Sequence, residues 1–300
     1  MAGVLSIGFV GFGEAAYNIA KGLRQPDIAP VRAYDINAHD QALGDKIQQR
    51  AQETGTRLVN TNEELARSSE IILCTVTANQ AASAAEQTAP YLDVHHIYAD
   101  LNSVSPGLKQ SIDRTIAATG ARFVEIAVMA PVPPHGHRVP MLAGGKAAPE
   151  FAARLTPFGF SVEVVSSEIG TASATKMFRS IIVKGLEALL TECVLGASRY
   201  GAEPRVFASL AESFPQIDWK ALADYMVGRV VVHGERRARE MEEVAETLRS
   251  LGIEPVMAEA IVKRMDWSAK LGLKARFAGE APKSYKDVLD ALAKMSAAAD

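Results

Sequence analysis

One short stretch near the N-terminus constrains the fold of this chain more than any other. From residue 8 it reads Gly-Phe-Val-Gly-Phe-Gly-Glu-Ala-Ala, which contains the pattern G-x-G-x-x-A at Gly11, Gly13 and Ala16. An apolar run precedes it, and a helical pattern at residues 14–23 follows it. In such a pattern the first glycine permits a tight turn, the second lets a ligand approach the backbone, and the small third residue lets the helix pack closely on the strand. The stretch predicts a strand, a glycine turn and a helix, the start of a parallel α/β unit.

A helix that begins at a glycine turn is suited to phosphate, because its first amides are free and its dipole is positive there. Asp35 ends a second apolar run, at about the 20-residue separation from the turn that is typical of a carboxylate binding a ribose. The pattern therefore predicts a dinucleotide site formed by Gly11, Phe12, Gly13, Glu14, Ala15 and Asp35. A carboxylate at Asp35 favours NAD, because it would repel the 2′-phosphate of NADP, which stays an alternative. The other interpretation is a tight turn that binds nothing.

The rest of the first half repeats the alternation of strand and helix. Further apolar runs lie at residues 71–76, 97–100 and 122–127, which predicts a parallel sheet with helices on both faces. Four prolines within residues 131–140 indicate a loop. Polar or small residues follow two of the strands, at the sheet edge where cofactors bind: Thr77, Ala78, Asn102 and Ser103. We expect them to orient the nicotinamide or the substrate, although turn and cap residues often occur at such positions.

The second half is helical throughout. A long helical pattern covers residues 173–199, and further helical segments are broken near Pro215, residues 252–255 and residues 279–282. The dense Glu and Arg residues after Arg236 fit a solvated helix face with i,i+4 ion pairs. The chain is therefore expected to form an α/β domain over residues 1–166 and an all-helical domain over residues 167–300.

Charge and cysteine content exclude several classes of function. Thirty-two Lys and Arg against 35 Asp and Glu give a net charge of -3, so nucleic-acid binding has no electrostatic support. The apolar runs are too short or too interrupted to cross a bilayer. Because the N-terminus leads directly into a strand pattern, we expect no signal sequence. Cys74 and Cys193 lie far apart within apolar segments, which predicts buried thiols in a reducing, cytoplasmic protein. His135 and His137 have no nearby partners to complete a metal site, and none is expected.

Four motifs together resemble the β-hydroxyacid dehydrogenase superfamily, which includes 3-hydroxyisobutyrate dehydrogenase and the NAD-binding part of 6-phosphogluconate dehydrogenase. Residues 8–13 resemble its opening G-x-I-G-L-G, residues 100–106 its D-x-S-T-x-S-P, residues 141–145 a strand ending in Gly-Gly, and residues 170–176 its G-x-G-x-x-x-K. The resemblance covers most of the first 190 residues. It implies a Rossmann-type parallel-sheet domain followed by an all-helical domain for substrate binding and dimerisation, and hence a homodimer. It also implies NAD(P)-dependent hydride transfer between a nicotinamide and a hydroxy acid or related alcohol.

The family's catalytic lysine falls on Lys176 by this resemblance. Oxidation of a hydroxyl by hydride transfer needs a group that takes the hydroxyl proton, and the reverse reaction needs a proton donor, so one lysine can serve as general acid and base. On a helix, Arg179 and Ser180 would share the face of Lys176. Without the motif, an exposed helix lysine would be the ordinary interpretation.

The sequence departs from the family at the substrate. Where the family has Ser-Gly-Gly after a strand, this chain has Met129-Ala130-Pro131, and where the family has asparagine four residues after its lysine, this chain has Ser180. Both elements hold a substrate carboxylate in the family. We therefore expect substrate contacts from Ser103, Met129, Arg179 and Ser180, with small hydroxy acids as poor substrates. An imine reductase and a non-catalytic NAD(P)-binding sensor are the alternatives.

Overall fold

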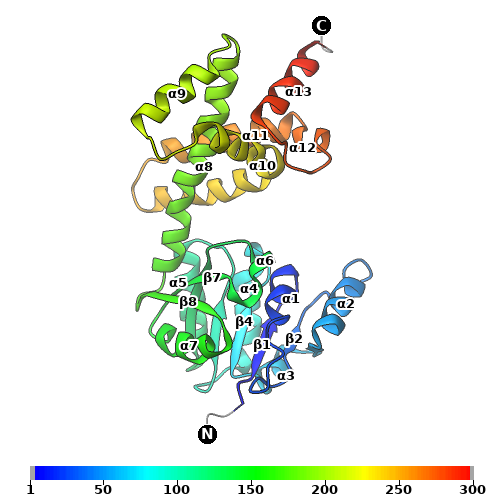
Figure 1. The fold of residues 1–300 in the computed structure, drawn as a ribbon. Helices are drawn as coiled ribbons and strands as arrows, with labels where there is room; N and C mark the ends of the chain where they lie inside the picture. The colour runs from blue at the N-terminus through cyan, green and yellow to red at the C-terminus, as the bar shows by residue number, and fades with distance from the viewer. Residues whose placement is uncertain (1–3, 298–300) are drawn as a thin grey trace. The chain divides into compact units, whose positions relative to one another are not determined.

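The computed structural model describes residues 4–297, and the chain forms two compact units that divide between Lys176 and Met177. The first unit is built on an eight-stranded sheet with the order β3-β2-β1-β4-β5-β6-β7-β8 (Figure 1). Its strands are β1 (Ile7–Val10), β2 (Arg32–Tyr34), β3 (Arg57–Leu58), β4 (Ile71–Cys74), β5 (Ile97–Asp100), β6 (Arg122–Val128), β7 (Pro140–Gly144) and β8 (Ser161–Ser166).

The first six strands are parallel to one another, as predicted, and the strand order reverses between β1 and β4. Ligands of such sheets bind beyond the carboxyl ends of the strands at this reversal, because the connections leave on opposite faces there and open a crevice. The prediction of an all-parallel sheet is wrong at one place, since β7 pairs antiparallel with β6. Pro140, expected in a loop, is the first residue of β7, a position where proline is tolerated in a strand.

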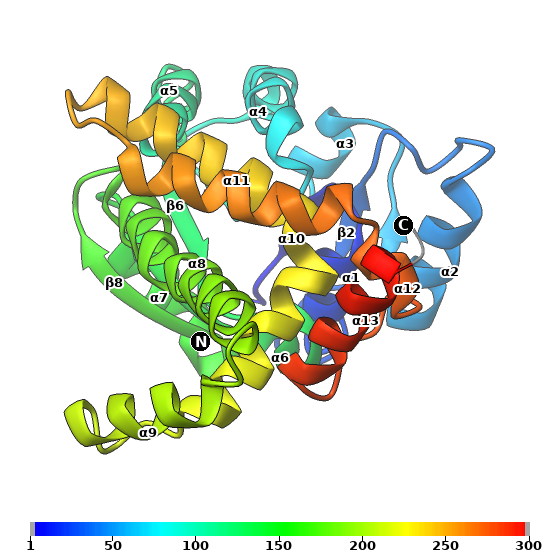
Figure 2. The same cartoon turned by 90° about the horizontal axis from the view of Figure 1, so that it is seen from above.

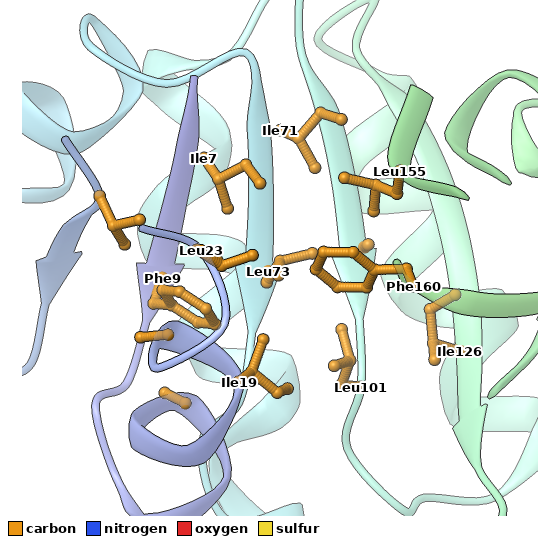
Figure 3. Packing of buried hydrophobic residues seen from close by; sticks show 14 of the residues in the cluster. Ile7, Phe9, Ile19, Leu23, Ile71, Leu73, Leu101, Ile126, Leu155 and Phe160 are labelled. Carbon is orange, nitrogen blue, oxygen red and sulfur yellow. The ribbon is translucent and has the colours of Figure 1, made fainter. Parts of the chain in front are cut away.

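Helices cover both faces of the sheet, as the alternating pattern predicted. They are α1 (Glu14–Ala20), α2 (Gly44–Thr54), α3 (Asn62–Ala66), α4 (Ala81–Thr88), α5 (Pro106–Ala117), α6 (Val132–His135) and α7 (Ala148–Leu155). One core lies between the sheet and α1, α2 and α7, and Figure 3 shows Phe9, Ile19, Leu73 and Leu155 within it. A second core lies between the opposite face and α3, α4 and α5. Because both faces are buried, the central strands are apolar at nearly every position rather than at alternate ones.

The second unit is helical, as predicted, and the chain enters it along α8 (Thr171–Ser198). Its other helices are α9 (Glu203–Ser213), α10 (Trp219–Ser250), α11 (Val256–Lys270), α12 (Leu273–Arg276) and α13 (Tyr285–Ala297). The breaks before α10, α11 and α13 fall where proline and glycine predicted them, whereas the break between α11 and α12 was not predicted. In Figure 2, α11 lies along α10, and Gly234 lets the two helices approach because a Cβ there would lie 2.8 Å from the carbonyl oxygen of Met265. None of the helices within residues 4–297 is long and apolar enough to cross a membrane.

Candidate nucleotide-binding and catalytic site

The two glycines of the turn have different reasons to be glycine. Gly11 has a φ of +82°, and a Cβ there would lie 2.8 Å from Cγ1 of Val76. Its amide donates to the carbonyl of Tyr34 over 2.8 Å, and its carbonyl accepts from Oγ1 of Thr75 over 2.8 Å, so it connects β1 to the ends of β2 and β4. Gly13 has open space where a Cβ would be, with no atom within 4 Å. Protein packing therefore does not require glycine at Gly13, and the open backbone suits close approach of a ligand.

Asp35 couples the end of β2 to the glycine turn. Its Oδ2 accepts from the amide of Phe12 over 2.6 Å, and its Oδ1 accepts from the amide of Asn37 over 2.8 Å. The Phe12 ring is buried in the core and stacks edge-to-face on Phe9. Phe12 thus shapes the turn, and its predicted contact with the cofactor stays a prediction. Each Asp35 oxygen retains a lone pair for a ligand hydroxyl.

A cavity of about 700 Å³ lies at the carboxyl ends of β1, β2 and β4, with further walls from α2 and α4. Five of the predicted cofactor residues line it: Gly11, Gly13, Glu14, Asp35 and Thr77. Its volume is in the range of small-molecule and cofactor sites. The position matches the reversal of strand order, where the fold favours a dinucleotide. The open face of Gly13, the ribose-type carboxylate and the cavity together fit a nicotinamide dinucleotide.

The sequence reasoning missed two cations on the wall of this cavity. Lys46 and Arg50 line it from α2 and are separated by four residues, which places them on one face of that helix. The signal was available, because the helix after the ribose-binding carboxylate faces the same ligand. Glu14 lies in the first turn of α1, where the helix dipole stabilises its negative charge. Because this carboxylate would repel a phosphate, a phosphate contact at Glu14 would use its backbone amide.

Three other predicted cofactor residues lie outside this lining. Ala15 is half-buried on α1, and Ala78 packs against the second core. Asn102 is buried just beyond β5, where its Nδ2 donates to Oδ1 of Asp100 and to Sγ of Cys74, the latter over 3.3 Å. As cofactor contacts, all three stay predictions.

Asp100, which accepts the hydrogen bond of Asn102, also forms a buried ion pair with Lys109. The sequence analysis did not identify this pair. Lys109 and Asp100 are both fully buried. Nζ of Lys109 donates to Oδ2 of Asp100 over 2.8 Å and to the Asp100 carbonyl over 2.6 Å. The available signal was a lysine at an apolar-face position of α5, three residues before the buried Ile112. This lysine fixes the end of β5, where Asn102 and Ser103 begin.

Lys176 and Ser103, which were predicted from separate motifs, meet in the structure. Nζ of Lys176, on the second turn of α8, donates to Oγ of Ser103 over 2.5 Å. Lys176 is half-buried and Ser103 is exposed. Met129 follows directly after β6, whose carboxyl end neighbours that of β5. Arg179 and Ser180 belong to the second unit and stay predictions as substrate contacts.

The cysteines and loop histidines offer no further reactive group at this site. Burial and the neighbouring Asp100 charge raise the pKa of Cys74 to about 12, so it is an inert core thiol as predicted. Cys193 is half-buried, so the prediction that both thiols are buried is wrong for it. His137 packs edge-to-face on Phe160, with ring centroids 5.7 Å apart. No group of three or more His, Cys, Asp or Glu within residues 4–297 is arranged to hold a metal ion.

The chain matches two family models and several related proteins. Residues 6–153 match the NAD binding domain of 6-phosphogluconate dehydrogenase, and residues 197–268 match the "Domain of unknown function (DUF1932)". A conserved hypothetical protein from Sinorhizobium meliloti 1021 is 38% identical, with 88% of each chain covered and a TM-score of 0.80. Conserved protein MTH1747, whose structure reveals similarity with 3-hydroxyacid dehydrogenases, is 31% identical over 92% of this chain and 100% of that one, with a TM-score of 0.77.

A curated enzyme is a more distant relative. The mitochondrial 3-hydroxyisobutyrate dehydrogenase of Drosophila melanogaster is 25% identical over 215 residues, which cover 70% of this chain and 64% of that enzyme. These matches agree with the glycine turn, the strand order and the helical second unit. The chain belongs to the β-hydroxyacid dehydrogenase superfamily, as an NAD-binding domain of the 6-phosphogluconate dehydrogenase type followed by a DUF1932 domain.

Proposed function

We propose that the protein is an NAD(P)-dependent oxidoreductase that transfers a hydride between a nicotinamide and a hydroxy acid or related alcohol. The observation that carries this proposal is the hydrogen bond between Lys176 and Ser103 at the carboxyl end of β5. This end is adjacent in the sheet to the end of β4, which borders the 700 Å³ cavity. The amino group of Lys176 thus lies one strand away from the region that fits the dinucleotide, which supports a role for it in proton transfer.

The cofactor would be held by the residues of the cavity. Gly11, Gly13 and the first amides of α1 would face its phosphates, and Asp35 its ribose. When bound, the nicotinamide supplies the acceptor or donor of the hydride. Asp35 supports NAD as the preferred form, whereas Lys46 and Arg50 supply positive charge that would also tolerate NADP.

Lys176 would act at a single atom, Nζ. In the oxidation direction, the neutral amine takes the proton of the substrate hydroxyl as the carbonyl forms. In the reduction direction, the ammonium group returns a proton to the oxygen on which negative charge develops. Ser103 would orient this lysine by accepting its hydrogen bond.

The substrate is expected to differ from the small acids of the family. Met129 adds flexible apolar surface where the family has Ser-Gly-Gly, and Ser180 is shorter than the family's asparagine. Loss of one hydrogen bond to a charged group costs about 1.5–3 kcal/mol, or roughly tenfold or more in kcat/KM. A bulkier or partly apolar hydroxy compound should therefore react better than 3-hydroxyisobutyrate.

A substrate screen tests the proposal directly. Hydroxy acids, alcohols, aldehydes and imines are offered with NAD(H) and NADP(H), and the absorbance of reduced nicotinamide is followed. With the best substrate, Lys176→Ala should lower kcat by about two to four orders of magnitude, the usual contribution of one acid–base group. Cofactor affinity should change little, because Lys176 lies outside the cavity lining, and the exposed Lys263→Ala is the matched control. Near-native turnover of Lys176→Ala, or turnover of imines alone, would refute the assignment.

A further inference from the structure

One row of residues crosses the sheet at the carboxyl ends of its parallel strands, and two adjacent members of this row are acidic. The strand pairing places these residues next to each other in register: Tyr34, Val10, Cys74, Asp100, Glu125 and Gly144. Residues paired in register point to the same face of a sheet. Asp100 and Glu125 are both fully buried, and a buried charge is costly unless it is compensated. Lys109 compensates Asp100, and Glu125 needs a different partner.

The partner of Glu125 is the start of α8. Its Oε1 accepts from the amides of Gly170 and Ala172 over 2.7 and 3.0 Å. Its Oε2 accepts from the amide and the hydroxyl of Ser173 over 3.3 and 2.8 Å. A carboxylate at a helix N-terminus is also favoured by the helix dipole. Strand β6 thus supplies the cap of a helix that begins 46 residues later in the sequence.

Two glycines leave the room that this arrangement needs. A Cβ on Gly144 would lie 2.5 Å from Oε1 of Glu125. Gly145 has a φ of +112°, and a Cβ there would lie 2.6 Å from Cδ1 of Ile169, just before α8. Glycine is therefore needed at residue 144 to leave space for the Glu125 carboxylate, and at residue 145 to leave space for Ile169, which precedes α8.

Lys176 lies one helix turn after the residues that bind the Glu125 carboxylate. It follows Ala172 by four residues and Ser173 by three, and residues at these spacings are neighbours on one helix face. Glu125 therefore holds the first turn of α8, and Lys176 extends to Ser103 from the next turn of the same helix. We propose that Glu125 is a positioning residue, which fixes the rotation and height of the first α8 turns so that Nζ of Lys176 faces Ser103. This inference rests on the proposed function of Lys176.

The test combines kinetics with a readout that does not need turnover. In Glu125→Gln the amide group keeps the size of the side chain but removes the charge and places N–H donors against amides. With the best substrate from the screen, kcat should fall about ten- to a hundredfold while KM for the cofactor stays unchanged, as expected when a catalytic group is misplaced by about 1 Å. Glu125→Asp should recover part of the loss, and Glu163→Gln, an exposed carboxylate on β8, should have no effect.

The second readout is the acetylation of Lys176 by limiting acetic anhydride, measured by mass spectrometry relative to the exposed Lys263. Glu125→Gln should raise this ratio, as should Ser103→Ala, which removes the hydrogen-bond acceptor directly. Gly144→Ala presses on the same carboxylate, so it should raise the ratio too and serves as the second variant if Glu125→Gln does not fold. If the wild-type protein turns over no substrate, the proposed function fails while the acetylation ratio still decides the position of Lys176. An unchanged ratio in both Glu125→Gln and Gly144→Ala would overturn the inference.

Discussion

Replacement of Lys109 by methionine tests the buried ion pair beneath the site. Lys109→Met keeps the length of the side chain but removes all three donors of the ammonium group. The Asp100 carboxylate and carbonyl then lose donors at 2.8 and 2.6 Å, with no access to water. Removal of one partner of a buried pair costs about 3–5 kcal/mol, because the remaining charge stays uncompensated. For a unit of this size, that loss lowers Tm by roughly 6–20 °C.

The assay must follow the two units separately, because a single free energy of unfolding is not well defined for a chain of two units. Native-state amide exchange at Leu73 and Ala99, in the neighbouring strands β4 and β5, reports the stability around the ion pair. Trp219 and Trp267 both lie in the helical unit, so their emission follows that unit separately. The double variant Lys109→Met/Asp100→Asn should recover much of the loss, since neither residue of the former pair then carries a charge. A Lys109→Met protein within about 1 kcal/mol of wild type would refute the reasoning.

Asp35→Ser should relax the preference for NAD by about fivefold, since removal of a like charge at about 4 Å in water is worth about 1 kcal/mol. Titration with NADH and NADPH measures this, and a wild-type protein that binds NADPH at least as tightly as NADH contradicts it. Burial raises the pKa of Glu187 from 4.5 to about 7, against the lowering effect of Arg229, and Arg237 also forms an ion pair with this carboxylate. The folded protein then holds a proton that the unfolded chain has lost, so the free energy of unfolding should fall as pH rises from about 4.5 to 7, by up to about 3 kcal/mol. Urea unfolding followed by tryptophan emission should show this slope in wild type and not in Glu187→Gln; a flat wild-type profile would count against it. The protein should sediment at micromolar concentration as a homodimer, because Ile182 and Leu189 on α8 are 67% and 58% exposed; a monomer would contradict this.

The fold could be predicted where local chemistry determines it. The spacing of Gly11, Gly13 and Asp35 specifies a turn, an open backbone and a carboxylate at adjacent strand ends, and the structure has all three. The direction of β7 could not be predicted in the same way. A five-residue apolar strand reads alike in both directions, and whether it runs parallel to its neighbour depends on how the connection over Pro131 to Pro140 crosses the sheet edge.

The residues of the site that reach its surface could be predicted from the sequence, and the fully buried charged residues behind them could not. Lys176 and Ser103 were identified from motifs, and the structure brings them together. Lys109 and Glu125 were not identified, because charged residues are rarely fully buried and nothing in a single sequence indicates their partners. Asp100, nine residues earlier, compensates Lys109. The amides and the hydroxyl at residues 170–173 compensate Glu125, through contacts that exist only once segments more than 40 residues apart have packed.

The hydrogen bonds between Glu125 and residues 170–173 also determine where the chain can be truncated to give the first unit alone. β8 ends at Ser166, and the change to a helical pattern in the sequence suggested a boundary there. A chain that ended at residue 166 would keep the Glu125 carboxylate in the interior and remove every amide and hydroxyl that it accepts from. Such a fragment would have to protonate the carboxyl group or open the β6–β7 edge to water. A fragment that extends through Lys176 keeps these donors. The buried carboxylate of the first unit is therefore compensated only when the fragment includes the first turns of α8.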